Sequence, residues 1–189
     1  REKKLYYRAE DKLGSTEFTF SRFLVPFLNN YEGWALFCDC DILFLNSIED
    51  LFDQVDDKYA VMCVKHDYKP KSETKMDGKI QSIYPRKNWS SLVLWNCSHS
   101  SNKKITKELV NDDQITGKYL HRFSWLKDDE IGSINHHWNW LVGWYQEPKD
   151  GKPKAIHYTV GGPWFADYRF CEYHEVWKDN LFKMMNSDK

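Results

Sequence analysis

Two aspartates interrupt an apolar run of the sequence, WALFCDCDILFL, at residues 34–45. A carboxylate removed from water without a partner is costly, so a buried one is normally paired, hydrogen-bonded or bound to metal. Because side chains alternate along a strand, we expect Asp39 and Asp41 on one face and Cys38 and Cys40 on the other. Carboxylate oxygens are the ligands that hard divalent cations prefer. The pair therefore predicts a divalent-metal site at the end of a buried strand.

The segments around this pair alternate between strand and helix patterns. The apolar spacing predicts a helix over residues 16–29, with Pro26 inside it, and another over residues 46–55 that Asn46 or Ser47 caps. Further elements are expected as strands over 32–40, 59–66, 90–97 and 155–160, two short helices within 102–121, and a C-terminal helix over 170–189. This interleaving predicts an α/β fold in which helices sandwich a sheet.

Two of these helices are expected to pack on the core through one apolar face. In the helix over 46–55 this face consists of Ile48, Leu51, Phe52 and Val55. In the C-terminal helix it consists of Tyr173, Val176, Trp177, Leu181 and Met184.

Composition bounds the class of protein. The 189 residues suit a single domain over the whole chain, with residues 1–14 as a polar lead-in. Lys and Arg number 27 against 28 Asp and Glu, which argues against a nucleic-acid binder. No apolar run approaches the roughly 18 residues of a membrane span. The five cysteines form no CxxC pair, which argues against structural zinc and favours reduced thiols in a cytoplasmic protein.

Several motifs share an order with a known enzyme family. The Asp39–Asp41 pair resembles the DxD motif of metal-dependent nucleotide-sugar glycosyltransferases of the GT-A fold. The segments that follow resemble glycosyltransferase family 8, the glycogenin and lipopolysaccharide galactosyltransferase group. They are HYTVGGPWF at 157–165, WSSLVLWNC at 89–97, NDDQ at 111–114, HHWNWL at 136–141 and STEFTFSRF at 15–23. The resemblance spans roughly residues 15–165 and implies a Rossmann-type central mixed sheet.

This resemblance implies a Mn²⁺ or Mg²⁺ site and a UDP-sugar site. Asp39 would contact the ribose or the metal, Asp41 would bind the metal, and His157 would be the third protein ligand. Asp113 would bind sugar hydroxyls, and Gln114 would lie beneath the anomeric carbon. The donor contacts implied are Arg22, Asp39, Arg86, Asn88, Ser90, Ser91, Gly161, Gly162 and Trp164.

The sequence departs from the family pattern at two places. No basic residue lies between His157 and Trp164, where the family has a lysine, which leaves phosphate charge to the metal and to Arg86, Lys87 or Arg169. Trp89 stands where the family has asparagine, with Asn88 one position away.

Each motif also has an ordinary structural interpretation. His157 could be a core histidine donating to a carbonyl, and Gly161–Gly162 a plain turn. Gln114 could form a capping box with Asn111, since N-x-x-Q has that spacing. For Asn139 and the pair His136–His137, two roles are open: ordinary packing in the core or a loop, or contact with the sugar acceptor.

The function implied is transfer of a hexose, glucose or galactose, from a UDP-sugar to a glycan or other hydroxyl acceptor, with retention. No conventional nucleophile is evident, so we expect a front-face route in which the leaving phosphate deprotonates the acceptor. The loop at 67–88 is expected to shape the acceptor surface. The chain begins at Arg1 without a preceding Val/Ile-rich strand, which suggests a fragment or an N-terminally short form of the fold with an incomplete base pocket.

Two other functions fit the same residues. An inactive remnant of the fold would bind sugar or nucleotide without turnover, with a structural metal. A phosphohydrolase of the haloacid dehalogenase type also uses an Asp-x-Asp pair, although Leu43 stands where those enzymes have Thr or Val.

Overall fold

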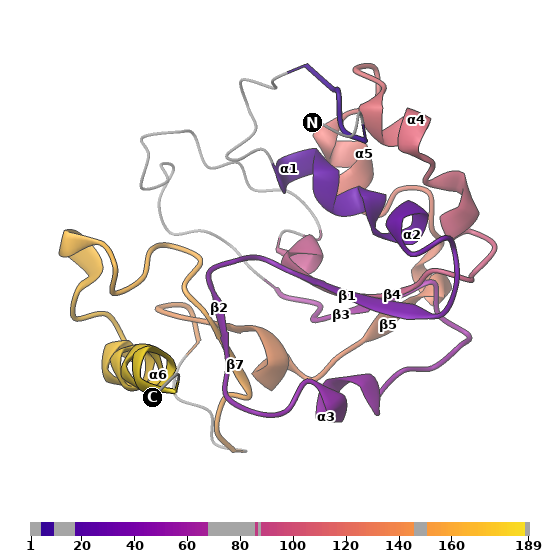
Figure 1. The fold of residues 1–189 in the computed structure, drawn as a ribbon. Helices are drawn as coiled ribbons and strands as arrows, with labels where there is room; N and C mark the ends of the chain where they lie inside the picture. The colour runs from indigo at the N-terminus through magenta and orange to yellow at the C-terminus, as the bar shows by residue number, and fades with distance from the viewer. Residues whose placement is uncertain (1–4, 10–17, 68–85, 87, 146–150, 188–189) are drawn as a thin grey trace. The chain divides into compact units, whose positions relative to one another are not determined.

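A computed structural model describes residues 5–9, 18–67, 86, 88–145 and 151–187 (Figure 1). Most of the loop expected at 67–88, the start of the helix expected from residue 16, and Lys87 lie outside the described residues. The chain divides into two compact units. Unit 1 consists of Arg1–Cys38 and Phe52–Ile134, and unit 2 of Asp39–Leu51 and Asn135–Lys189.

Unit 1 is built on a mixed four-stranded sheet in the order β1-β4-β3-β5. Its strands are β1 (Trp34–Cys38), β3 (Val61–Cys63), β4 (Leu92–Asn96) and β5 (Ile131–Ser133). Strand β4 pairs antiparallel with both β1 and β3, and β5 pairs parallel with β3. All five residues of β4 are buried, as expected for a central strand covered on both faces.

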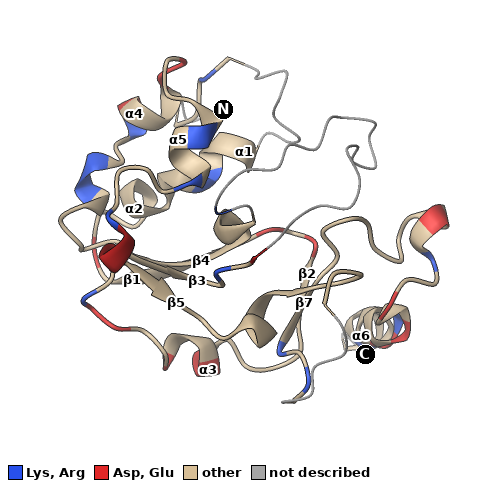
Figure 2. Ribbon diagram, turned by 180° about the vertical axis from the view of Figure 1, so that it is seen from behind, with Lys and Arg blue, Asp and Glu red and all other residues tan. Residues whose placement is uncertain are grey.

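Short helices cover one face of this sheet (Figure 1). They are α1 (Phe18–Ser21), η1 (Arg22–Leu24), α2 (Val25–Leu28), α4 (Lys107–Asn111) and α5 (Gly117–His121). The single helix predicted over 16–29 is thus three pieces, with Pro26 in the first turn of α2, where its missing N–H costs no hydrogen bond. The two short helices predicted within 102–121 are α4 and α5. Figure 2 shows cationic and anionic residues on α4 and on the C-terminal helix α6 (His174–Asn186).

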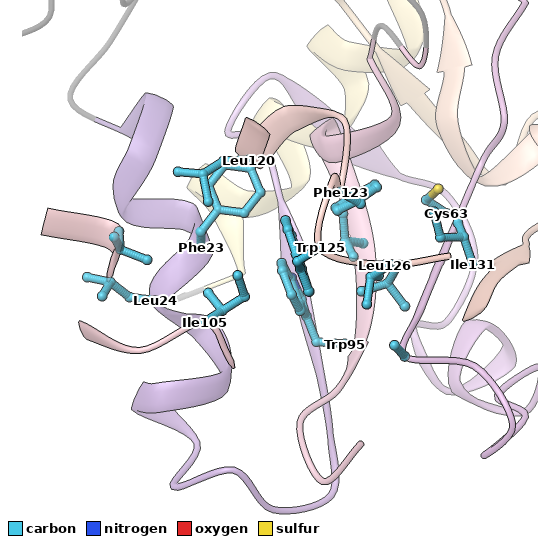
Figure 3. Close-up of a cluster of buried hydrophobic side chains, with 14 of the residues drawn as sticks. Phe23, Leu24, Cys63, Trp95, Ile105, Leu120, Phe123, Trp125, Leu126 and Ile131 are labelled. Carbon is cyan, nitrogen blue, oxygen red and sulfur yellow. The ribbon is translucent and has the colours of Figure 1, made fainter. Parts of the chain in front are cut away.

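The core of unit 1 lies between these helices and the sheet (Figure 3). Trp95 on β4 stacks on Trp125, with ring centroids 6.1 Å apart and planes at 5°. The rings of Phe23 and Phe123 meet Trp95 edge-on at 6.2 and 6.3 Å. Val93 and Trp95 point into this cluster, as the two-residue period of a strand requires.

Unit 2 has a mixed three-stranded sheet in the order β2-β7-β6. The strands are β2 (Ile42–Phe44), β6 (Trp140–Leu141) and β7 (Ala155–His157). Helix α6 (His174–Asn186) packs Val176 and Trp177 against a small core that includes Ile156 and Tyr158. The predicted face of this helix is wrong at its end, because Met184 is 64% exposed.

The remaining elements are short. They are α3 (Glu49–Phe52), η2 (Trp89–Ser91), η3 (Asn102–Lys104), η4 (Asp128–Glu130), η5 (His136–Asn139) and η6 (Ala166–Tyr168). Helix α3 is shorter than the 46–55 predicted, with Ile48 exposed, and Ser47 Oγ accepts from the amide of Glu49, the first residue of the helix, at 3.2 Å. The prediction of an α/β fold with mixed sheets flanked by helices is confirmed. Among the helices described, none has both the length and the apolar character to cross a bilayer.

The stacked Trp95 predicts a large stability effect. We expect Trp95→Ala to lower the free energy of unfolding by about 3–5 kcal/mol, because the variant leaves a cavity among the rings of Phe23, Phe123 and Trp125. Phe182→Ala, at a side chain that is 70% exposed, should change it by less than about 0.5 kcal/mol. Urea denaturation followed by circular dichroism measures both, and equal midpoints for the two variants would contradict the assigned core.

Candidate functional site

Asp39, Asp41 and His157 gather at one point of unit 2. One ligand atom from each lies within 4.8 Å of the others. Strand β1 ends at Cys38, so the aspartates lie in the turn before β2, and the expected alternation along a strand is wrong here. The antiparallel register pairs Ile42 with His157, and the Tyr158 amide donates to the Asp41 carbonyl at 3.0 Å. Strand pairing therefore fixes Asp41 beside His157.

The His157 ring is held by a side chain on the other side. Its Nδ1 lies 2.8 Å from Asn139 Oδ1, and both residues are buried. Since an amide oxygen only accepts, this bond assigns the hydrogen to Nδ1 and leaves the Nε2 lone pair pointing away from Asn139. His157 thus donates to a side-chain amide rather than to a backbone carbonyl.

The free ring nitrogen faces a carboxylate. His157 Nε2 lies 3.3 Å from Asp41 Oδ1, and the Asp41 side chain is 30% exposed. With the hydrogen on Nδ1, both facing atoms are acceptors, so a shared cation, either a proton on Nε2 or a metal ion, stabilises the arrangement. Two carboxylates and one imidazole are a donor set that suits Mn²⁺ or Mg²⁺.

Asn139 is the site residue whose role the sequence left open. It is the last residue of η5, immediately before β6, and β6 pairs in parallel with β7. The two roles considered from the sequence, packing in the core and contact with the sugar acceptor, do not include orienting His157. The two residues are 18 positions apart, and no spacing rule joins them. Only the place of Asn139 in the HHWNWL segment pointed to it.

The glycine loop after β7 is a turn closed by its own amide. The Gly161 N–H donates to the Tyr158 carbonyl at 2.9 Å, so this amide has a partner within the loop. A Cβ on Gly162 would lie 2.2 Å from the Trp164 ring, so glycine is needed here for close packing. The Trp164 ring is 42% exposed and lies 5.6 Å from the Tyr158 ring and 5.7 Å from the Trp177 ring.

Four predicted donor contacts lie in unit 1 near η2. Arg22 Nη1 donates to the Ser90 carbonyl at 3.0 Å, and its guanidinium lies over the Phe37 ring at 4.9 Å. Ser91 Oγ donates to the Asn88 carbonyl at 2.7 Å, and Asn88 itself is left-handed at φ 63°. The structure brings Arg22, Asn88, Ser90 and Ser91 together.

The Arg86 side chain binds other residues of unit 1. Its guanidinium donates to the Arg122 carbonyl and pairs with Asp128, whose side chain is 93% exposed. It also lies 5.5 Å from the centroid of the Trp89 ring. A role on phosphate would require Arg86 to exchange its exposed Asp128 partner, a contact of low value in solvent.

Asp113 and Gln114 lie in the exposed connection between α4 and α5. Arg8 holds this connection: its guanidinium donates to Val110 O at 3.2 Å and to Asp112 O at 2.7 Å, and also to Ile115 O at 2.5 Å. Carbonyls at the end of a helix have no partner within the helix, so a buried arginine stabilises them. The pair is thus held on a fixed turn of unit 1.

The structure excludes the capping box considered as an alternative for Asn111 and Gln114. Asn111 is the last residue of α4, and its Oδ1 accepts from the amides of Tyr7 and Arg8 at 2.7 and 3.1 Å. The Gln114 amide donates instead to Asp112 Oδ1 at 2.8 Å.

Several solved glycosyltransferase structures share this fold. The apo form of GlyE from Streptococcus pneumoniae matches with a TM-score of 0.59 at 17% identity, over 91% of this chain and 44% of that one. The bifunctional WbbM matches at 0.62 and 15% identity, over 94% and 36%. The galactosyltransferase LgtC, solved with donor and acceptor sugar analogs, matches at 0.52 and 13% identity, over 85% and 65%. The chain thus has the GT-A fold and spans less than two thirds of each of these proteins.

The sequence comparison defines the family. Protein CDI of Arabidopsis thaliana is 52% identical over 192 residues, which cover 100% of this chain and 73% of that protein. The chain belongs to the family of this protein. No family model matches it.

The Asn139 contact predicts a loss of metal affinity. We expect Asn139→Leu to weaken Mn²⁺ binding by about 10- to 100-fold, because His157 loses the acceptor that fixes its tautomer and ring orientation. Asn139→Asp keeps an acceptor and should bind Mn²⁺ more tightly than Asn139→Leu. Electron paramagnetic resonance of free Mn²⁺ measures both, with the exposed Asn186→Leu on α6 as control. Equal affinity in the leucine variant and wild type would remove Asn139 from the site.

The cysteines differ in environment, which predicts their reactivity. None of the five forms a disulfide; Cys40 is exposed between the two aspartates, whereas burial raises the pKa of the Cys63 thiol to about 12. A raised pKa keeps Cys63 protonated and unreactive at every pH well below 12. At pH 8 we expect iodoacetamide to alkylate Cys40 at least about tenfold faster than Cys63. Peptide mass spectrometry measures the two rates, and comparable rates would contradict the described burial.

Proposed function

We propose that this chain is a metal-dependent glycosyltransferase domain that moves a hexose from a UDP-sugar to a glycan or other hydroxyl acceptor with retention. The observation that carries the proposal is the convergence of Asp39, Asp41 and an oriented His157 in unit 2. The GT-A fold supports the reaction class. The family 8 assignment rests on the order of the sequence motifs, and LgtC, whose structure holds donor and acceptor sugar analogs, has the same fold.

The reaction requires that negative charge on the departing diphosphate be stabilised. A bound divalent cation would supply Lewis-acid stabilisation and a template for the phosphates. Asp41 and His157 would hold this cation, while Asn139 keeps the His157 lone pair directed at it. The half-buried carboxylates keep part of their hydration, which lowers the free-energy cost of placing two anionic groups together.

Residues of unit 1 would hold the sugar. Arg22 and the Asn88–Ser91 turn carry hydrogen-bonding groups that would contact the donor, and Arg8 fixes the turn that presents Asp113 and Gln114. Gln114 is a poor nucleophile. A front-face route, in which the leaving phosphate accepts the acceptor's proton, requires no protein base.

A second candidate is binding without turnover. Three groups proposed for the phosphates and sugar already have partners within the chain: the Gly161 amide, the Arg22 guanidinium and the Arg86 guanidinium. The lysine that the family has in the glycine loop is missing as well. A protein that binds nucleotide or sugar without transfer would tolerate both features.

The test is calorimetric titration of UDP with Mn²⁺ and with chelator. We expect binding that requires Mn²⁺ and that weakens at least about 100-fold in Asp41→Asn, because the variant removes one anionic ligand. Asp179→Asn, on the exposed surface of α6, is the matched control and should bind as wild type does.

The outcomes separate the candidates. UDP binding followed by release of UDP from one of a panel of UDP-sugars would support the transferase. Metal-dependent binding with no release from any donor would favour the binding protein. If UDP bound equally well in chelator, the proposed metal centre would be refuted.

A further inference from the structure

We propose that His121 is a positioning residue that joins the segments carrying Arg22, Ser90 and the Asp113–Gln114 pair. This inference rests on the proposed function, since those segments would hold the sugar donor. His121 is the last residue of α5, which begins just after the Asp113–Gln114 connection. Neither the sequence motifs nor the family resemblance includes this histidine.

The first contact is a short hydrogen bond. His121 Nδ1 lies 2.7 Å from Ser90 Oγ, and Ser90 is 6% exposed. A buried hydroxyl needs a partner, and loss of that partner leaves the hydroxyl with the cost of its desolvation. The carbonyl of the same Ser90 accepts from Arg22 Nη1 at 3.0 Å. A single residue of η2 therefore connects His121 to Arg22.

The second contact is packing of the imidazole ring. The Phe23 ring, next to Arg22 in η1, meets His121 edge-on, with centroids 5.2 Å apart and planes at 82°. At the other end of α5, a Cβ on Gly117 would lie 3.6 Å from the Phe20 ring and 3.8 Å from His121. The ring is thus fixed between α5 and the helices at 18–24, which directs Nδ1 at Ser90.

These contacts matter because α5 has only five residues. A helix this short has almost no stability of its own, so tertiary contacts set its position. Thr116 Oγ1 caps its start by accepting from the Tyr119 amide at 3.2 Å. The cap fixes one end of α5, beside Gln114, and His121 fixes the other end against Ser90. The geometry of the donor residues in unit 1 then depends on Nδ1 of one ring.

Two substitutions separate the ring nitrogens. The amide of asparagine places a polar atom near the position of Nδ1, whereas that of glutamine places one near Nε2. We expect His121→Asn to retain the Ser90 contact and His121→Gln to lose it. In the Gln variant the apparent KM for the sugar donor should rise about three- to tenfold, the worth of one hydrogen bond, while the Asn variant stays within about twofold of wild type. His99→Gln, at a partly exposed histidine of unit 1, is the control.

A second readout does not require turnover. The Nε–H signal of Arg22 in a ¹⁵N spectrum reports whether its guanidinium is held, since Nε donates to Phe18 O at 3.0 Å and Nη1 to Ser90. His121→Gln and Ser90→Ala should shift and broaden this signal alike, and the double variant should add nothing, because both remove one bond. His121→Asn should leave it in place. Thermal melting shows which variants are folded.

The two proposals fail in different ways. If wild-type protein bound no UDP, the proposed function would fall, and the Arg22 signal would still decide the role of His121. An unchanged Arg22 signal in folded His121→Gln, or additive effects in the double variant, would overturn the positioning role even in an active enzyme.

Discussion

The candidate site depends on two hydrogen-bond acceptors that face each other: the Nε2 lone pair of His157 lies 3.3 Å from a carboxylate oxygen of Asp41. Two acceptors at that distance repel each other unless a cation lies between them. The surrounding structure enforces the arrangement. The register of β2 with β7 brings Asp41 to His157, and Asn139 turns the ring so that Nε2 points at the carboxylate. Strand pairing and the Asn139 hydrogen bond therefore both hold Nε2 of His157 against the carboxylate of Asp41.

In unit 1, the residues predicted to contact the sugar donor lie on short helices and turns. Such elements leave many carbonyls without partners within the element. Buried side chains from distant segments supply the missing donors: Arg8 for the end of α4, and Arg22 for the Ser90 carbonyl. The same bonds that satisfy the backbone therefore fix the turns on which the candidate residues lie. Stability and site geometry are coupled in this unit.

The sequence predicted what local rules determine. Two short helices were predicted within 102–121, and the structure shows that α4 and α5 each begin at a local cap, Thr106 and Thr116. The grouping of Asp39, Asp41 and His157 into one candidate site was predicted from their residue types and from a family resemblance. The failures involve distant partners: the side chain of Asn111 binds residues more than 100 positions away, which removes it from the capping box. The contact of Asn139 with His157 was likewise not predicted, because strand pairing across the chain brings the two residues together and nothing local indicates that pairing.

The position of β1 explains why an apolar run contains two aspartates. The strand ends at Cys38, one residue before the first aspartate, so both carboxylates lie in a turn. Asp41 keeps 30% of its side chain exposed, and a partly hydrated carboxylate is far less costly than a buried one. The apolar residues on both sides belong to separate strands, β1 and β2, each of which needs them for its own sheet. The aspartates therefore interrupt the run at the place where the chain leaves one sheet for the other, and there both carboxylates remain partly exposed.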